Sequence, residues 1–277
     1  MVKSTVSNAS LPLRARLYHD SSAKNLDLSE ISKYLVEKDI FDEVEVRESF
    51  LKRYGNPLRE TAEKLAAVRV HNLETQKRNF KISNSEVQFE KKLIESDEDR
   101  ITGALYDGFR LGKVFTDLIP EDEREEFYLH VVFTDRFFGT WKSETRRYHA
   151  RVSVYGFPSI ISTTGIVDAP ARPKGFYRIE KHEGDGHRYN LRVLGRRNEF
   201  EGDFVDYDDK RLTEIMKGYV MQAAFYHLSS GPFCADKRCR LYNPHLQENI
   251  LSAQLTSPEF CAKHQSILER LQEKASG

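Results

Sequence analysis

The sequence predicts an α+β fold in which a mixed β-sheet packs against helices and a small helical subdomain lies at the C-terminus. Three observations support this prediction: a strand–helix–strand opening, a group of strand-like segments in the middle, and a long periodic helix that leads into a cysteine-rich tail. A chain of 277 residues can bury a sizeable core. We expect a flexible N-terminus at 1–10 and a single domain over 11–277.

The opening predicts a parallel pair of strands. Residues 11–18 alternate apolar and basic side chains, as a strand does, and residues 44–47 alternate again. Between them, Asp27 and Ser29 precede apolar residues at helical spacing and predict a helix over 27–35. Because a strand, a helix and a strand follow one another, we expect a crossover connection between two parallel strands.

The middle of the chain supplies the remaining strands and several helices. Helices are expected at 58–71, around 87–93 and at 102–118, the last two within a charged segment, 72–127. Strands are expected at 128–134, 148–155 and 159–164, with an aromatic loop around Gly139 and Trp141 after the first of them. A hairpin over 175–194 has its tip at 182–187, where turn glycines gather.

A helix from 208 to 229 is the most periodic segment of the sequence. Its apolar stripe, typical of a helix packed on a core, consists of Leu212, Ile215, Met216, Tyr219, Val220, Ala223, Tyr226 and His227. Two more helices are expected after it, at 244–255 and 262–274.

All three cysteines of the chain lie in the tail, 230–277, which we expect to form a zinc-knuckle subdomain. Cys234 and Cys239 form a Cys-x4-Cys pair, and Cys261 stands in a Cys-x2-His pair with His264. Two short ligand pairs separated by a longer loop are typical of structural zinc sites, and three thiolates with one imidazole complete a tetrahedral shell. The sequence therefore predicts one structural Zn²⁺. Two alternatives stay open: a disulfide with one free thiol, or three buried thiols with an exposed histidine.

Composition narrows the class of protein. Lys+Arg and Asp+Glu are both 43, so the formal net charge of zero does not favour a nucleic-acid partner. The polar N-terminus lacks the apolar core of a signal peptide, and no apolar run is long enough to span a membrane. We therefore expect a cytoplasmic protein whose partner is a protein or peptide.

The tail resembles that of the archaemetzincins, intracellular zinc metallopeptidases common in archaea. In that family a helix that carries HExxHxxGxxH runs into a Cys-x4-Cys pair and a later Phe-Cys-x2-Cys pair. Here Cys234, Cys239 and Cys261 fall on the first three cysteines, Phe260 on the aromatic residue, and His264 on the fourth cysteine. The resemblance covers about residues 128–270 and implies a metzincin-like fold, a structural zinc and an archaeal source.

The same alignment places the family's catalytic residues on side chains that cannot act. Its first histidine falls on Ala223, its glutamate on Ala224, its second histidine on His227 and its third on Phe233. A peptidase of this type needs two histidines one turn apart to hold zinc, and a glutamate to take a proton from the metal-bound water. Only His227 is retained, as a possible remnant. The resemblance therefore implies a pseudoenzyme.

Three functions remain open at this point. The first is a protein that has lost peptidase activity and acts by binding or regulation. The second is an active hydrolase with an atypical metal site, built from His182, His187 and His227 with Glu183 or Asp185, or from His130 and His149 near Asp135. The third is an interaction or assembly module that uses the zinc knuckle and the charged segment 72–127 as a contact surface.

Overall fold

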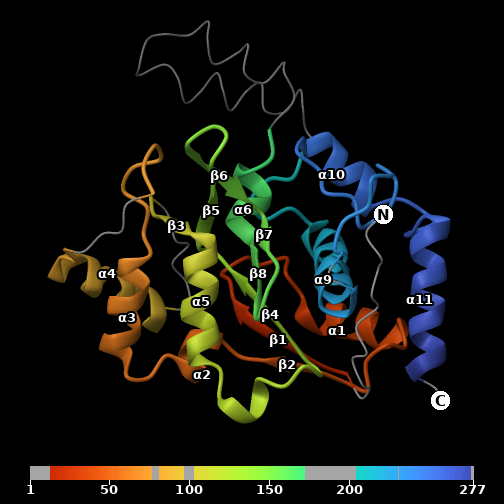
Figure 1. Ribbon diagram of the computed structural model, residues 1–277, viewed down its shortest axis with the longest axis horizontal. Coiled ribbons are helices and arrows are strands. Elements are labelled where there is room, and N and C mark those ends of the chain that lie inside the picture. The colour runs from red at the N-terminus through yellow and green to blue at the C-terminus, as the bar shows by residue number, and fades with distance from the viewer. Residues whose placement is uncertain (1–12, 77–80, 97–102, 172–203, 230, 276–277) are drawn as a thin grey trace, which may run out of the picture.

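The computed structural model describes residues 13–76, 81–96, 103–171, 204–229 and 231–275. It confirms an α+β fold, with helices on both faces of a central sheet and a second, smaller sheet beside it (Figure 1). The hairpin predicted at 175–194 lies outside the described residues.

The central sheet has the order β2-β1-β4-β8-β7. Its strands are β2 (Glu43–Arg47), β1 (Arg14–Asp20), β4 (Tyr128–Thr134), β8 (Ser159–Ser162) and β7 (Ser153–Val154). The first four are parallel, and β7 lies antiparallel at the edge. Helix α1 (Leu28–Glu37), capped by the Asp27 side chain, connects β1 to β2 and confirms the predicted crossover.

Both faces of this sheet are covered, as expected for a mainly parallel sheet. Every residue of β4 is buried. On β4, Leu129, Val131 and Phe133 contribute to a core with α1 and the C-terminal helices. Val132, from the opposite face, contributes to a second core formed largely by residues 50–119. The charged segment 72–127 therefore supplies core residues as well as surface.

A second sheet has the order β3-β5-β6, comprising β3 (Leu105–Asp107), β5 (Phe137–Lys142) and β6 (Arg147–Arg151). The aromatic loop predicted around Gly139 and Trp141 is wrong, because these residues lie in β5. A Cβ atom on Gly139 would lie 2.8 Å from the His149 carbonyl oxygen, so this glycine permits close strand pairing. The strand predicted at 148–155 is split into β6 and β7, which pair with different sheets.

The helices before the tail include α2 (Phe50–Tyr54), α3 (Leu58–Ala67), α4 (Asn84–Glu95), α5 (Gly108–Leu118), the short 3₁₀ helix η1 (Glu121–Glu123) and α6 (Thr163–Asp168). Three of them, α3, α4 and α5, confirm predicted helices with shifted ends, whereas α2, η1 and α6 were not predicted. Helix α6 begins at Thr163, so the strand predicted at 159–164 ends at Ser162. The helix predicted at 102–118 begins only at Gly108. Residues 105–107 form β3 instead, and the Asp107 side chain accepts a hydrogen bond from the Arg110 backbone N–H at 3.2 Å, which caps α5.

The C-terminal helices are α9 (Leu212–Ser229), α10 (Gln247–Gln254) and α11 (Ala262–Ala275), close to the predicted ranges. Helix α9 is buried on most of its surface, because α1, β4 and α10 all pack against it. No helix in the described ranges is both long and apolar enough to cross a lipid bilayer.

Candidate functional site

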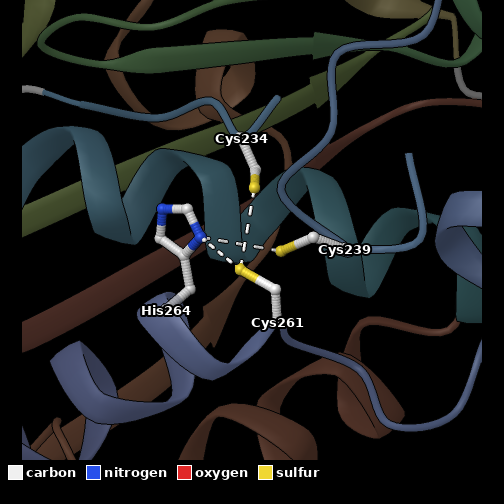
Figure 2. Close-up of side chains that lie close together, drawn as sticks. All are labelled: Cys234, Cys239, Cys261 and His264. Carbon is white, nitrogen blue, oxygen red and sulfur yellow. Dashed lines mark hydrogen bonds between the residues drawn. The ribbon is translucent and has the colours of Figure 1, made fainter. Parts of the chain in front are cut away.

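The four predicted metal-binding residues meet at one point beside α9 (Figure 2). Their ligand atoms all lie within 4.8 Å of one another. The Cys234 and Cys261 Sγ atoms are 3.8 Å apart, and His264 Nδ1 lies 3.2 Å from Cys261 Sγ and 3.7 Å from Cys239 Sγ. Within the part of the chain that the structure describes, this is the one such group of possible metal ligands. The cluster could therefore hold a metal ion.

Backbone hydrogen bonds fold the first cysteine pair into a tight loop. The Cys234 N–H donates to the Leu241 carbonyl at 2.8 Å, and the Cys239 N–H donates to the Asp236 carbonyl at 3.1 Å. The Arg240 N–H donates to the Glu259 carbonyl at 2.7 Å, which ties this loop to the segment that carries the second pair. These bonds aim both sulfur atoms at the same point.

The second pair is positioned by the start of α11. The Cys261 carbonyl accepts the first helical hydrogen bond, from the Gln265 N–H at 2.9 Å, so Cys261 stands immediately before the helix. His264 then lies one turn further along and is 3% exposed. Its ring packs edge-on against Phe225 of α9, with centroids 5.7 Å apart. The helix spacing thus turns Cys-x2-His into two adjacent ligands.

Electrostatics differ among the four ligands. Burial raises the pKa of the Cys239 thiol to about 12. Burial also acts against ionisation of Cys261, but hydrogen bonds from the backbone N–H of His264 and from the neighbouring groups together outweigh it, and the pKa of that thiol is lowered. Burial lowers the pKa of His264, which favours the neutral, metal-binding imidazole. A cation would compensate the buried thiolates.

All three cysteines are free thiols, so the alternative of a disulfide with one free thiol is wrong for this structure. The alternative of an exposed histidine is wrong as well, because His264 is buried among the sulfur atoms.

Helix α9 contains no metal site at the positions that the archaemetzincin resemblance assigns to catalysis. Ala223 and Ala224 are fully buried. The His227 Nε2–H donates to the Glu126 carbonyl oxygen at 2.7 Å, and burial lowers the pKa of this imidazole. His227 is thus a hydrogen-bonded residue that fastens α9 to the segment before β4.

The other predicted ligand sets are either separated or not described. His182, Glu183, Asp185 and His187 lie outside the described residues. His130 and His149 are not neighbours, because β4 and β6 belong to different sheets.

Each of these two histidines has its own partners. The His130 Nε2–H donates to the Glu123 carbonyl at 2.9 Å, and Nδ1 lies 2.8 Å from the Tyr18 hydroxyl. His149 Nε2 lies 2.7 Å from the Thr145 hydroxyl. They are satisfied strand histidines.

A cleft with a volume of 390 Å³ lies beside the metal cluster, between the β6–β7 strand and α9. Six consecutive residues, 150–155, form one wall, and Tyr219 and Tyr226 of α9 with Phe233 line the other. The loop that holds the metal cluster begins and ends at this cleft, since residues 232–233 and 243–245 line it too.

Sequence reasoning missed the cleft. It assigned Tyr219 and Tyr226 to the core stripe of the helix; Tyr219 is buried, but Tyr226 is half-buried and faces the cleft. One residue in the sequence hinted at such a surface: Phe233 stands directly before Cys234, beyond the end of the predicted helix, so it is an aromatic residue outside the core stripe of that helix. The walls come from distant segments, which no local pattern could bring together.

The comparisons with known proteins agree with a metallopeptidase relationship. Residues 11–271 match a family described as a probable metallopeptidase family (DUF6775). No curated protein and no solved structure matches the chain. Because the family match extends over nearly the whole chain, the protein belongs to this probable metallopeptidase family.

Proposed function

We propose that this protein is a member of its family without peptidase activity, which uses one structural Zn²⁺ and acts by binding a polypeptide in the cleft. The observation that carries the proposal is the identity of the residues that α9 places at the catalytic positions. Buried Ala223 and Ala224 stand where the archaemetzincin resemblance requires a zinc ligand and a general base, and His227 is bonded to a backbone carbonyl.

Zinc fits the donor set and spacing of the tail. Zn–S bonds of about 2.3 Å and Zn–N bonds of about 2.0–2.1 Å give tetrahedral edges of roughly 3.8 Å between sulfurs and 3.6 Å between sulfur and nitrogen. The corresponding distances are 3.8 Å between the sulfurs of Cys234 and Cys261, and 3.2 and 3.7 Å from His264 Nδ1 to the sulfurs of Cys261 and Cys239. Four protein ligands leave no open position for a substrate, which makes the site structural.

The cleft supports a binding role. Among the described strands, β6 and β7 each lie at the end of their sheet, and together they supply Ala150, Arg151, Ser153 and Val154 of the wall at 150–155. A strand at a sheet edge has backbone N–H and C=O groups on one side that can pair with an extended peptide. The edge strands that line the cleft could therefore bind a polypeptide without any catalytic group.

The competing proposal is an active hydrolase whose second metal uses His227 and the histidines at 182 and 187. We propose in addition that the chain is related to the archaemetzincins and that it is cytoplasmic. A reducing compartment suits it, because the thiols must stay reduced to bind metal.

The test is incubation of the zinc-loaded full chain with a mixture of fluorescent peptides, followed by fluorescence anisotropy and mass spectrometry. We expect some peptides to bind and all to remain intact. Cleavage that is lost in His227→Ala would support the hydrolase instead. If the chain neither binds nor cleaves any peptide, both proposed functions are excluded.

A further inference from the structure

The side chains of the cleft form an aromatic surface that is open to solvent. The Tyr155 ring lies at its centre, 6.2 Å from the Tyr226 ring and 5.8 Å from the Phe233 ring, with interplanar angles of 32° and 58°. Phe233 is 46% exposed, and Phe109 at the other side of the cleft is 64% exposed. Exposed apolar residues that gather at one place mark interaction sites or ligand grooves, and these residues line the same cleft.

Such rings favour an aromatic guest. Aromatic pairs gain energy in offset or edge-to-face arrangements at centroid distances of about 4.5–7 Å. The three cleft rings are already spaced in this range, so an additional ring can contact them from the solvent side. A volume of 390 Å³ is within the range of about 300–1,000 Å³ that is typical of small-ligand pockets.

The charge around the rings favours an acidic neighbour. No aspartate or glutamate is among the described residues that line the cleft, whereas Arg151 and His245 are. The Arg151 Nε–H donates to the Thr140 hydroxyl at 2.8 Å, and the described residues give its two terminal nitrogens no further partner. A guanidinium with two free nitrogens can bind a carboxylate in a bidentate manner. A cationic guest would be repelled, although the aromatic rings alone could accept one.

We infer that the cleft selects an extended acidic segment in which an aromatic side chain enters the ring cluster and a neighbouring carboxylate pairs with Arg151. This inference depends on the proposed binding function and specifies its partner. The backbone of the segment lies along 150–155, and the aromatic and acidic side chains give the specificity.

The experiment compares four fluorescein-labelled octapeptides by anisotropy with the zinc-loaded full chain. The first carries a central tryptophan flanked by aspartates; the others replace the tryptophan by leucine, the tryptophan by proline, or the aspartates by lysines. We expect the first peptide to bind about tenfold more tightly than each of the others, as loss of one good contact predicts.

Variants separate the two contacts. Arg151→Gln should remove the preference for aspartate over lysine and keep that for tryptophan over leucine, and Tyr226→Leu should do the reverse. Arg147→Gln, at the exposed start of β6, is the matched control and should bind like the unchanged chain. Thermal melting checks that each variant is folded.

The outcomes distinguish the specificity for an acidic, aromatic segment from the proposed binding of polypeptides in general. Equal binding of all four peptides, or preference for the lysine or proline peptide, overturns the specificity while polypeptide binding stands. Absence of binding by any peptide, together with none in the mixture described above, overturns both.

Discussion

Glu90 and Arg136 form an ion pair in the core between α4 and the end of β4. Their side chains are 0% and 1% exposed, and Arg136 Nη1 lies 2.6 Å from Glu90 Oε2. The Tyr106 hydroxyl donates to Glu90 Oε1 at 2.7 Å and accepts from Arg136 Nη1 at 2.7 Å. Both carboxylate oxygens of Glu90 are therefore hydrogen-bonded and Arg136 Nη1 has two partners, and such bonds offset part of the cost of burying the charges.

We predict that Glu90→Gln lowers the free energy of unfolding by about 3–5 kcal/mol, because it leaves the Arg136 guanidinium buried without its counter-charge. Urea denaturation measures the change. Gln88→Ala, at an exposed position of the same helix, should change stability by no more than about 0.5 kcal/mol. Equal effects of the two substitutions would show that the buried pair is not important for stability.

His130 is a second residue whose charge matters. Burial lowers its pKa to about 4, and its two ring nitrogens are engaged by Tyr18 and the Glu123 carbonyl in the neutral form. In the unfolded chain the pKa is about 6.5. Between these values the unfolded state binds more protons than the folded state, so stability is complete above pH 6.5 and falls as the pH drops towards 4.

We predict that His130→Gln flattens the dependence of stability on pH between 6.5 and 4, where the wild-type residue accounts for a loss of up to about 3 kcal/mol. Unfolding in urea at several pH values gives the slope. Gln88→Ala, which replaces an exposed residue that does not titrate, is the control and should keep the wild-type slope. His227 contributes in the same direction, because burial also lowers its pKa.

At the level of secondary-structure elements, the cleft is directly connected to the metal loop, residues 234–242, which carries Cys234 and Cys239. The Gln222 side chain of α9 donates to the Tyr242 carbonyl at 2.9 Å and accepts from the Tyr155 hydroxyl at 2.5 Å. It therefore connects the end of the metal loop to the centre of the aromatic cluster. The loop also begins directly after Phe233, so both of its ends hold cleft residues.

We predict that Cys239→Ser lowers the melting temperature by on the order of 10 °C, because metal-binding energy becomes folding energy when the site forms only in the folded chain. It should also weaken peptide binding, since both ends of the loop lose their anchor. Lys237→Ser changes an exposed residue of the same loop and should leave both properties unchanged. A stable variant that binds peptide normally would contradict a structural role for the metal.

For the whole molecule, sequence patterns predicted the elements that have strong local signals. The crossover from β1 to β2 followed from alternation and from the Asp27 cap, and the grouping of the four residues that could hold a metal ion followed from ligand spacing. In both cases the signal lies in short local patterns: alternating strands with a helix cap in the first, and two ligand pairs in the second.

The other features of the fold and of the site depend on contacts between residues that are distant in the sequence. Gly139 favours a loop on sequence grounds, but the structure places it in β5, where the lack of a side chain permits close approach to the His149 carbonyl. Strand β3 has three residues, too few to show an alternating pattern, and is stabilised by pairing with β5. The cleft is formed by residues from Phe109 to His245, so its existence could be inferred only from the folded chain.

The most direct test of the account is the metal content of the purified full chain, measured by elemental analysis for the unchanged protein and two variants. We predict one zinc per chain in the unchanged protein, one in His227→Ala and markedly less in Cys239→Ser, because only the cysteine belongs to a metal shell. Two zinc ions per chain, with one lost in His227→Ala, would contradict the account and restore the active hydrolase.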